Sequence, residues 1–275
     1  MPLSPQKINL FNTFGFLKFP GLFADDIERI SEEFETVWAG KEHDYTKRSF
    51  LVEFVEKNDY LSALMDDPRI EETIGSLVGN DFNYTSSDGN LYAGDTGWHS
   101  DGFTRHPGYT SIKIAFYLDS VKADTGCLRV IPGSHLPGNV FGEAIDQVLI
   151  ANNETGYASL EKNWGVEGDS VPAVALESEP GDMVLFNHRI KHSSFGGSGR
   201  RRMFTLNFEE RYRQEDLGLL SDEFEIYTLF DHHGRPYVDR LVETSNAKRL
   251  VHLEQRISNV HYLNKILHDA KLLES

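Results

Sequence analysis

The chain has very little cysteine and no long apolar run. Cys127 is the single cysteine among 275 residues, which excludes an internal disulfide framework and favours a reducing compartment. No stretch holds 18 consecutive apolar residues, and the N-terminus lacks a basic region followed by an apolar run. We therefore expect no membrane span, no secretory signal and a cytoplasmic location.

Basic residues are scarce relative to acidic ones. Lysine and arginine number 27 against 43 aspartates and glutamates, so the formal net charge is −16. Nucleic-acid binding needs a basic surface, and so does binding to an anionic membrane, so we expect neither partner. We interpret the excess of acid as a contribution to solubility.

The first 80 residues carry two helical patterns. A short strand is expected at 16–19, and a helix then runs to Trp38, with Asp25 as its expected cap. A second helix is expected to begin at Asp67-Pro68 and to end before Gly79. These helices are predicted to form a layer that packs on the rest of the domain.

From residue 80 the pattern changes to short β-like runs separated by Gly, Pro, Asn and Asp, which predicts a sandwich or a barrel. The run 111–120 alternates, with Ile112, Ile114 and their even-numbered neighbours facing one way. By contrast, 137–168 is expected to be a long irregular loop, which is usually functional or disordered. The predicted strands are Phe82–Thr85, Asn90–Ala93, Ser111–Ser120, Cys127–Ile131, Val171–Leu176, Asp182–Phe186 and Arg201–Arg213.

After Arg213 the pattern becomes helical again. Between 247 and 273 leucine, isoleucine and valine recur as an apolar stripe, and such a stripe needs a partner surface. We expect a helical C-terminal extension, 214–275, that packs on the core or on a second copy of the chain in a homodimer.

The stretch Trp98-His99-Ser100-Asp101-Gly102 carries the first chemical signal. In a strand, residues two apart point the same way, so His99 and Asp101 would project side by side as two metal ligands. A distant histidine would complete a facial triad of two histidines and one carboxylate, which suits non-haem Fe(II). Spacing alone leaves His188 and His192 both open as the third ligand.

An arginine cluster, 200–202, opens the apolar strand that follows these histidines. It is either a solvated edge or a clamp, because arginine binds a carboxylate through two parallel hydrogen bonds. If the strand alternates, Arg201 shares the more polar face with Thr205 and Asn207. Ser194 would add a further hydrogen bond to a bound carboxylate.

Four segments in this order resemble the phytanoyl-CoA dioxygenase family of Fe(II)- and 2-oxoglutarate-dependent oxygenases. They are 98–102, Gly126–His135, Pro180–Ser194 and the arginine cluster, and the resemblance runs from about residue 8 to about 212. It implies a mainly β fold with flanking helices, in which a double-stranded β-helix (a jelly-roll, cupin-like core) carries N-terminal helices. The oxygenase domain would be 1–213, with its core at about 80–213.

The resemblance also assigns residues. The implied metal ligands and catalytic residues are His99, Asp101 and His192; the implied 2-oxoglutarate contacts are Arg201, Ser194 and Asn90, with Arg202 as the near alternative to Arg201. Substrate contacts are expected from the barrel mouth, at Phe103, Arg105, Trp164 and Arg213.

The implied cofactor is Fe(II), with 2-oxoglutarate and O₂ as cosubstrates. The implied reaction hydroxylates, desaturates or cyclises at an unactivated C–H bond of a small metabolite or natural-product intermediate, with release of succinate and CO₂. Asp101 favours hydroxylation over halogenation, because the family's halogenases replace this carboxylate with a small residue. The alternatives are a cupin-like metalloenzyme with Zn²⁺ or Mn²⁺ and no 2-oxoglutarate, and a non-catalytic ligand-binding barrel.

Overall fold

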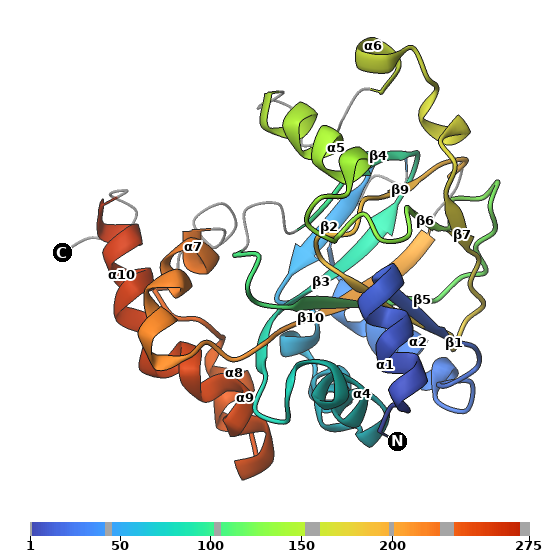
Figure 1. The fold of residues 1–275 in the computed structure, drawn as a ribbon. Coiled ribbons are helices and arrows are strands. Elements are labelled where there is room, and N and C mark those ends of the chain that lie inside the picture. Colours follow the sequence, from blue (N-terminus) through green and yellow to red (C-terminus); the bar gives the residue numbers. More distant parts are fainter. Residues whose placement is uncertain are drawn as a thin grey trace.

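Two antiparallel sheets lie at the centre of the chain, with helices around them (Figure 1). The computed structural model describes residues 2–41, 46–101, 106–151, 160–197, 201–225 and 234–269. The strands are β1 (Phe16–Phe19), β2 (Ser49–Val52), β3 (Asn83–Tyr92), β4 (Thr96–His99), β5 (Ser111–Tyr117), β6 (Leu128–Val130), β7 (Val174–Leu176), β8 (Met183–Asn187), β9 (His192–Ser194) and β10 (Arg201–Glu209).

The order of the strands explains how distant segments meet. One sheet runs β1-β8-β5-β10-β3-β2 and the other β4-β9-β6-β7. From β3 to β10 the chain passes repeatedly between the two sheets, as in a jelly roll. Ala115, Tyr117 and Met203 of the larger sheet pack against Leu128 and Val130 of the smaller one. The interior between the sheets can therefore receive side chains from both.

The alternation predicted for 111–120 is confirmed over β5. Ile112, Ile114 and Phe116 join the core under the N-terminal helices, whereas Ala115 and Tyr117 face the smaller sheet. Both faces of β5 are buried, so each apolar set has its own partner surface.

Several strands differ from the prediction, β3, β9 and β10 among them. The two runs expected at 82–85 and 90–93 are one strand, β3, because β10 and β2 pair with its polar middle and satisfy the backbone there. The short strand β9 carries no β pattern of its own. The strand expected to reach Arg213 ends at Glu209.

The helices before β3 are α1 (Pro5–Phe14), α2 (Ile27–Trp38), α3 (Asp59–Ala63) and α4 (Pro68–Val78), with short 3-10 turns η1 (Val55–Lys57) and η2 (Leu64–Asp66). The start predicted for the second helix is confirmed in α4, where the Asp67 carboxylate accepts from the backbone N–H of Arg69. The cap predicted for α2 is wrong: Asp26, not Asp25, precedes that helix, and its side chain makes no capping bond. Ile30 and Phe34 of α2 are buried in the core with Phe204 of β10.

The loop expected at 137–168 is wrong. It contains α5 (Val140–Ala151), α6 (Leu160–Trp164) and the 3-10 turn η3 (Gly168–Ser170). Ile145 and Leu160 form a small core with Trp98, the residue before His99. These helices depend on tertiary packing against Trp98, which a local pattern does not reveal.

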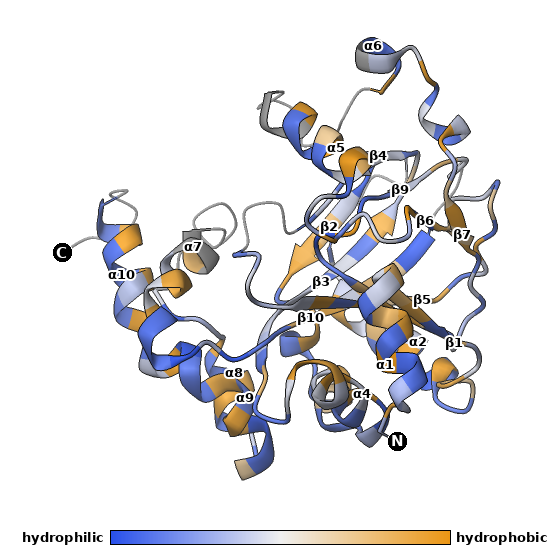
Figure 2. Ribbon diagram, in the orientation of Figure 1, coloured by the Kyte–Doolittle hydropathy of each residue, from blue (hydrophilic) through white to orange (hydrophobic). Residues whose placement is uncertain are grey.

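The C-terminal segment holds the 3-10 turn η4 (Gln214–Leu219), α7 (Leu220–Glu225), α8 (Asp239–Glu243), α9 (Ala247–Ser258) and α10 (Val260–Asp269). Its apolar stripe is divided at Asn259, and Figure 2 shows apolar and polar residues side by side on these helices. His252 of α9 stacks on Phe82 next to β3, and Leu263 of α10 packs with Phe224 of α7. Much of the stripe is thus buried within one chain, while the homodimer and the boundary at residue 213 stay predictions. Among the described residues, no helix has the length and apolarity needed to cross a bilayer.

Candidate active site

Strand pairing brings the two histidines together. In the β4–β9 ladder His99 lies opposite His192, and their ring centroids are 4.1 Å apart. The expectation that His99 and Asp101 share a strand is wrong, because β4 ends at His99 and Asp101 begins the turn that follows. Its carboxylate nevertheless lies beside both rings.

The distances within this trio suit a metal ion. Asp101 Oδ1 is 3.5 Å from His99 Nε2, and Asp101 Oδ2 is 3.6 Å from His192 Nε2. Within the described ranges, these three residues form the one cluster with metal-ligand geometry, and their ligand atoms lie within 4.8 Å of one another. His188 is not part of it, since its ring bonds to the Ser111 hydroxyl and to the Asn207 amide oxygen.

Hydrogen bonds to backbone carbonyls orient both imidazoles. His99 Nδ1 lies 2.8 Å from the Gly97 carbonyl oxygen, and His192 Nδ1 lies 3.0 Å from that of Ile190. An Nδ1–H that donates to a carbonyl leaves the Nε2 lone pair for a metal, as in many metal-ligating histidines. The Nε2 atoms are the ones that face Asp101.

The protonation states favour ligation. Burial lowers the pKa of His192 to about 3, with His99 adding to the effect, so its ring is neutral at neutral pH. Burial would raise the pKa of Asp101, but the Lys113 ammonium, 2.7 Å from Oδ2, and the two histidines hold that pKa well below its usual range. A neutral imidazole and an ionised carboxylate are the forms that bind metals.

Arg201 lies in a buried cradle at the end of β9. Its side chain is 6% exposed, and it donates to Ser194 Oγ at 2.5 Å, to the Gly94 carbonyl at 3.0 Å and to the Gly126 carbonyl. Among the described residues no acidic group pairs with it, and its Nε has no hydrogen-bond partner. A Cβ at Gly126 would lie 2.6 Å from its Cζ, so glycine is needed for this approach. A buried cation without an anion is costly, which marks the cradle as a place for one.

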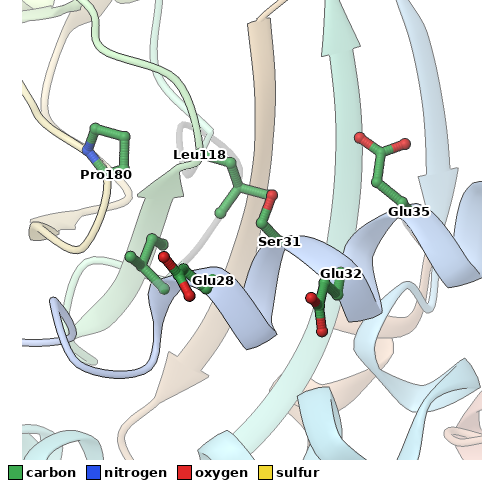
Figure 3. Close-up of a pocket in the computed structure, with 7 residues that line it drawn as sticks. Glu28, Ser31, Glu32, Glu35, Leu118 and Pro180 are labelled. Carbon is green, nitrogen blue, oxygen red and sulfur yellow. The ribbon is translucent and has the colours of Figure 1, made fainter.

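Arg202 points to the opposite side of β10. It forms an ion pair with Asp119 at 2.6 Å and with Glu35 at 3.0 Å, and it donates to Ser31 of α2. Ser31 and Glu35 line a shallow pocket on the outer side of the molecule, along α2 (Figure 3). Arg202 is therefore occupied by structural partners away from the histidines.

The structure describes some of the remaining predicted site residues and not others. Asn90 is buried on the inner side of β3, where its amide donates to Asp88. Trp164 packs on Phe141 of α5, and Arg213, 68% exposed, pairs with Asp216. A substrate role for these two residues stays a prediction. The predicted substrate residues Phe103 and Arg105 lie outside the described residues.

A polar wall lies beside the trio, and the sequence predicted only its β10 part, the polar face with Thr205 and Asn207. The wall comprises Ser86 and Asp88 of β3, Lys113 of β5, and Thr205 and Asn207 of β10, which are neighbours in the strand register. Thr205 donates to Asp88, and Asn207 donates to the Ser86 carbonyl at 3.1 Å. A lysine and an aspartate on the inner positions of buried strands were the available signal.

Comparison with known proteins identifies the family. The family model described as phytanoyl-CoA dioxygenase matches residues 11–203. The chain belongs to the phytanoyl-CoA dioxygenase family. A protein of Dictyostelium discoideum, named phytanoyl-CoA dioxygenase domain-containing protein 1 homolog, is 28% identical over 120 residues, which is 42% of this chain and 41% of that relative. The match thus spans less than half of the relative.

Solved structures share the fold. HygX from Streptomyces hygroscopicus, with nickel and 2-oxoglutarate bound, is 15% identical with a TM-score of 0.59, over 77% of this chain and 89% of that chain. EctD from S. alaskensis, with 2-oxoglutarate and 5-hydroxyectoine, is 19% identical with a TM-score of 0.56, over 77% and 79%. The epimerase SnoN from nogalamycin biosynthesis is 18% identical with a TM-score of 0.56, over 74% and 83%.

Proposed function

We propose that this family member is an Fe(II)- and 2-oxoglutarate-dependent dioxygenase. The observation that carries the proposal is the buried Arg201 guanidinium, which has no acidic partner among the described residues and reaches Ser194 on the same short strand as His192. A zinc or manganese enzyme of the cupin type has no need of such an anion site. The triad and the cradle together match a metal that is chelated by a dicarboxylic 2-oxo acid.

Each residue then has a separate task. His99, Asp101 and His192 would hold the metal and leave three positions open. Arg201 and Ser194 would bind the distal carboxylate of 2-oxoglutarate and fix its orientation by charge-assisted hydrogen bonds. When bound, Fe(II) supplies the activation of O₂, which no side chain of the chain can perform.

We further propose hydroxylation, or a related desaturation or cyclisation, because Asp101 fills the carboxylate position of the triad. The polar wall supports a small hydrophilic substrate. The half-buried charges of Asp88 and Lys113 would lose their remaining water against an acyl chain, and that desolvation is unfavourable. The substrate is thus expected among polar metabolites or natural-product intermediates.

The proposal is tested by an anaerobic titration of 2-oxoglutarate into the Fe(II)-loaded protein. Chelation by a 2-oxo acid should produce a saturable visible charge-transfer band, which Asp101→Ala should abolish. A protein that binds one equivalent of metal but gives no band would refute the 2-oxoglutarate assignment and favour the cupin-like alternative.

A further inference from the structure

The ion pair between Lys113 and Asp101 has no role in the chemistry described so far. Lys113 lies between Ile112 and Ile114 on β5, and its side chain is only 17% exposed. Burying an ammonium costs several kcal/mol unless a partner compensates it. The partner here is a proposed metal ligand, so the contact bears directly on how that ligand binds.

The two oxygens of Asp101 have different neighbours. Each oxygen faces one imidazole, Oδ1 that of His99 at 3.5 Å and Oδ2 that of His192 at 3.6 Å. Only Oδ2 also has the ammonium beside it, with Lys113 Nζ at 2.7 Å. A carboxylate binds a metal through one oxygen or through both. An ammonium bonded to Oδ2 competes for the lone pairs of that oxygen and leaves Oδ1 as the better ligand atom.

A second carboxylate, that of Asp88, also acts on the Lys113 ammonium. The Asp88 carboxylate on β3 attracts it electrostatically, and Asp88 is itself fixed by hydrogen bonds from Asn90 and Thr205. In the sheet Lys113 lies opposite Asn207 of β10. Thr205, two residues earlier on β10, lies opposite Asp88 of β3. The pairing of β5 with β10 therefore fixes the backbone from which the Lys113 side chain reaches Asp101.

We propose that Lys113 is a positioning residue that keeps Asp101 a one-oxygen ligand and so reserves a metal position for the 2-oxo acid. This inference rests on the proposed function, since it concerns the same metal. A carboxylate that chelated through both oxygens would occupy one of the positions that 2-oxoglutarate needs. Lys113 thereby acts on cosubstrate binding through Asp101.

Loss of Lys113 should move two affinities in opposite directions. The variant Lys113→Met removes a positive charge beside the cation and frees the second oxygen of Asp101, so metal binding should be unchanged or tighter. Competition for the metal position should weaken 2-oxoglutarate binding at least about tenfold, the size expected when a charged contact is lost. A residue that only stabilised the fold would not produce this split.

The experiment compares Lys113→Met, Lys113→Arg and Lys191→Met with the wild-type protein. Co(II) affinity is measured by calorimetry, and 2-oxoglutarate affinity by the charge-transfer band of the anaerobic Fe(II) form. Lys113→Arg keeps a charged donor and should restore cosubstrate affinity. Lys191 is the matched control, because it is also buried and pairs with Asp146 at 2.9 Å, but it has no bond to Asp101 in the described structure.

The split between the two affinities supports the inference. Wild-type 2-oxoglutarate affinity in Lys113→Met overturns it, and so does a parallel loss of metal and cosubstrate. If Lys113→Met does not fold, Lys113→Gln replaces it, because its side chain is shorter and uncharged. It should show the same split, with metal affinity kept and 2-oxoglutarate affinity weakened. A wild-type protein that binds Co(II) but not 2-oxoglutarate would instead refute the proposed function.

Discussion

Each face of β10 carries an arginine, and the two arginines differ in whether an acidic residue pairs with them. On the inner face Arg201 is buried, and no described acidic residue pairs with it; on the outer face Arg202 pairs with Asp119 and Glu35. The two arginines are adjacent in the sequence and carry the same guanidinium group. A charge that serves the fold has its partner within the chain, whereas a charge that serves a site lacks one until a ligand arrives. This contrast supports the proposal that the functional site lies on the inner face.

The largest effect should come from the metal ligands. His99→Ala or His192→Ala should weaken Co(II) binding more than the roughly 10–100-fold typical when only a hydrogen-bond partner of a ligand is removed. Calorimetry measures the affinity, and circular dichroism checks that the fold is retained. His188→Gln is the control, because His188 lies on the inner side but bonds only protein groups; if it lost metal equally, the triad would be misassigned.

The paired arginine variants test the contrast itself. Arg201→Ala should weaken 2-oxoglutarate binding by about 10–100-fold, since two charged hydrogen bonds are lost. Arg202→Ala should leave that affinity unchanged and lower the free energy of unfolding by about 1 kcal/mol, as for other partly exposed ion pairs. Cosubstrate titration and urea unfolding measure the two effects. If Arg202→Ala weakened 2-oxoglutarate binding and Arg201→Ala did not, Arg202 would be the residue that binds the carboxylate.

A glycine variant should disturb the cradle without removing its charge. In Gly126→Ala the new Cβ would overlap the Arg201 guanidinium, so the guanidinium must shift and 2-oxoglutarate should bind several-fold more weakly. Gly126 also has φ +88°, a backbone cost of about 1–2 kcal/mol for alanine. Gly40→Ala carries the same kind of backbone cost at φ +74° with no atom within 4 Å, and should lower stability alone. Equal cosubstrate affinity in the two variants would contradict the cradle.

The smallest effect should be on the pH dependence of stability, through His252 of α9. Burial lowers the pKa of His252 below the usual value for histidine, so the unfolded chain binds more protons there than the folded one. Stability should therefore be full above about pH 6.5 and decrease as the pH falls. In His252→Gln the thermal midpoint should depend less steeply on pH between 7.5 and 5.5. An unchanged slope in His252→Gln would contradict the assignment.

Local patterns predicted the elements whose causes are local. The alternation in β5 and the Asp67 cap of α4 depend on residues a few positions apart, and both are present. The family motif predicted which residues of the site meet. Spacing did not predict α5, whose Ile145 packs on Trp98, or the approach of Lys113 to Asp101, because these contacts join segments distant in sequence. A lysine in a buried strand was a signal for such a contact, but it did not identify the partner.

The most direct test of the inner-face site compares 2-oxoglutarate with 2-oxovalerate, which has the same chain length but lacks the distal carboxylate. Both are titrated anaerobically into the Fe(II)-loaded wild-type protein and into Arg201→Ala. The wild-type protein should strongly prefer 2-oxoglutarate, and Arg201→Ala should bind the two acids about equally. A preference for 2-oxoglutarate that survives in Arg201→Ala would contradict the account, because the distal carboxylate would then be bound elsewhere.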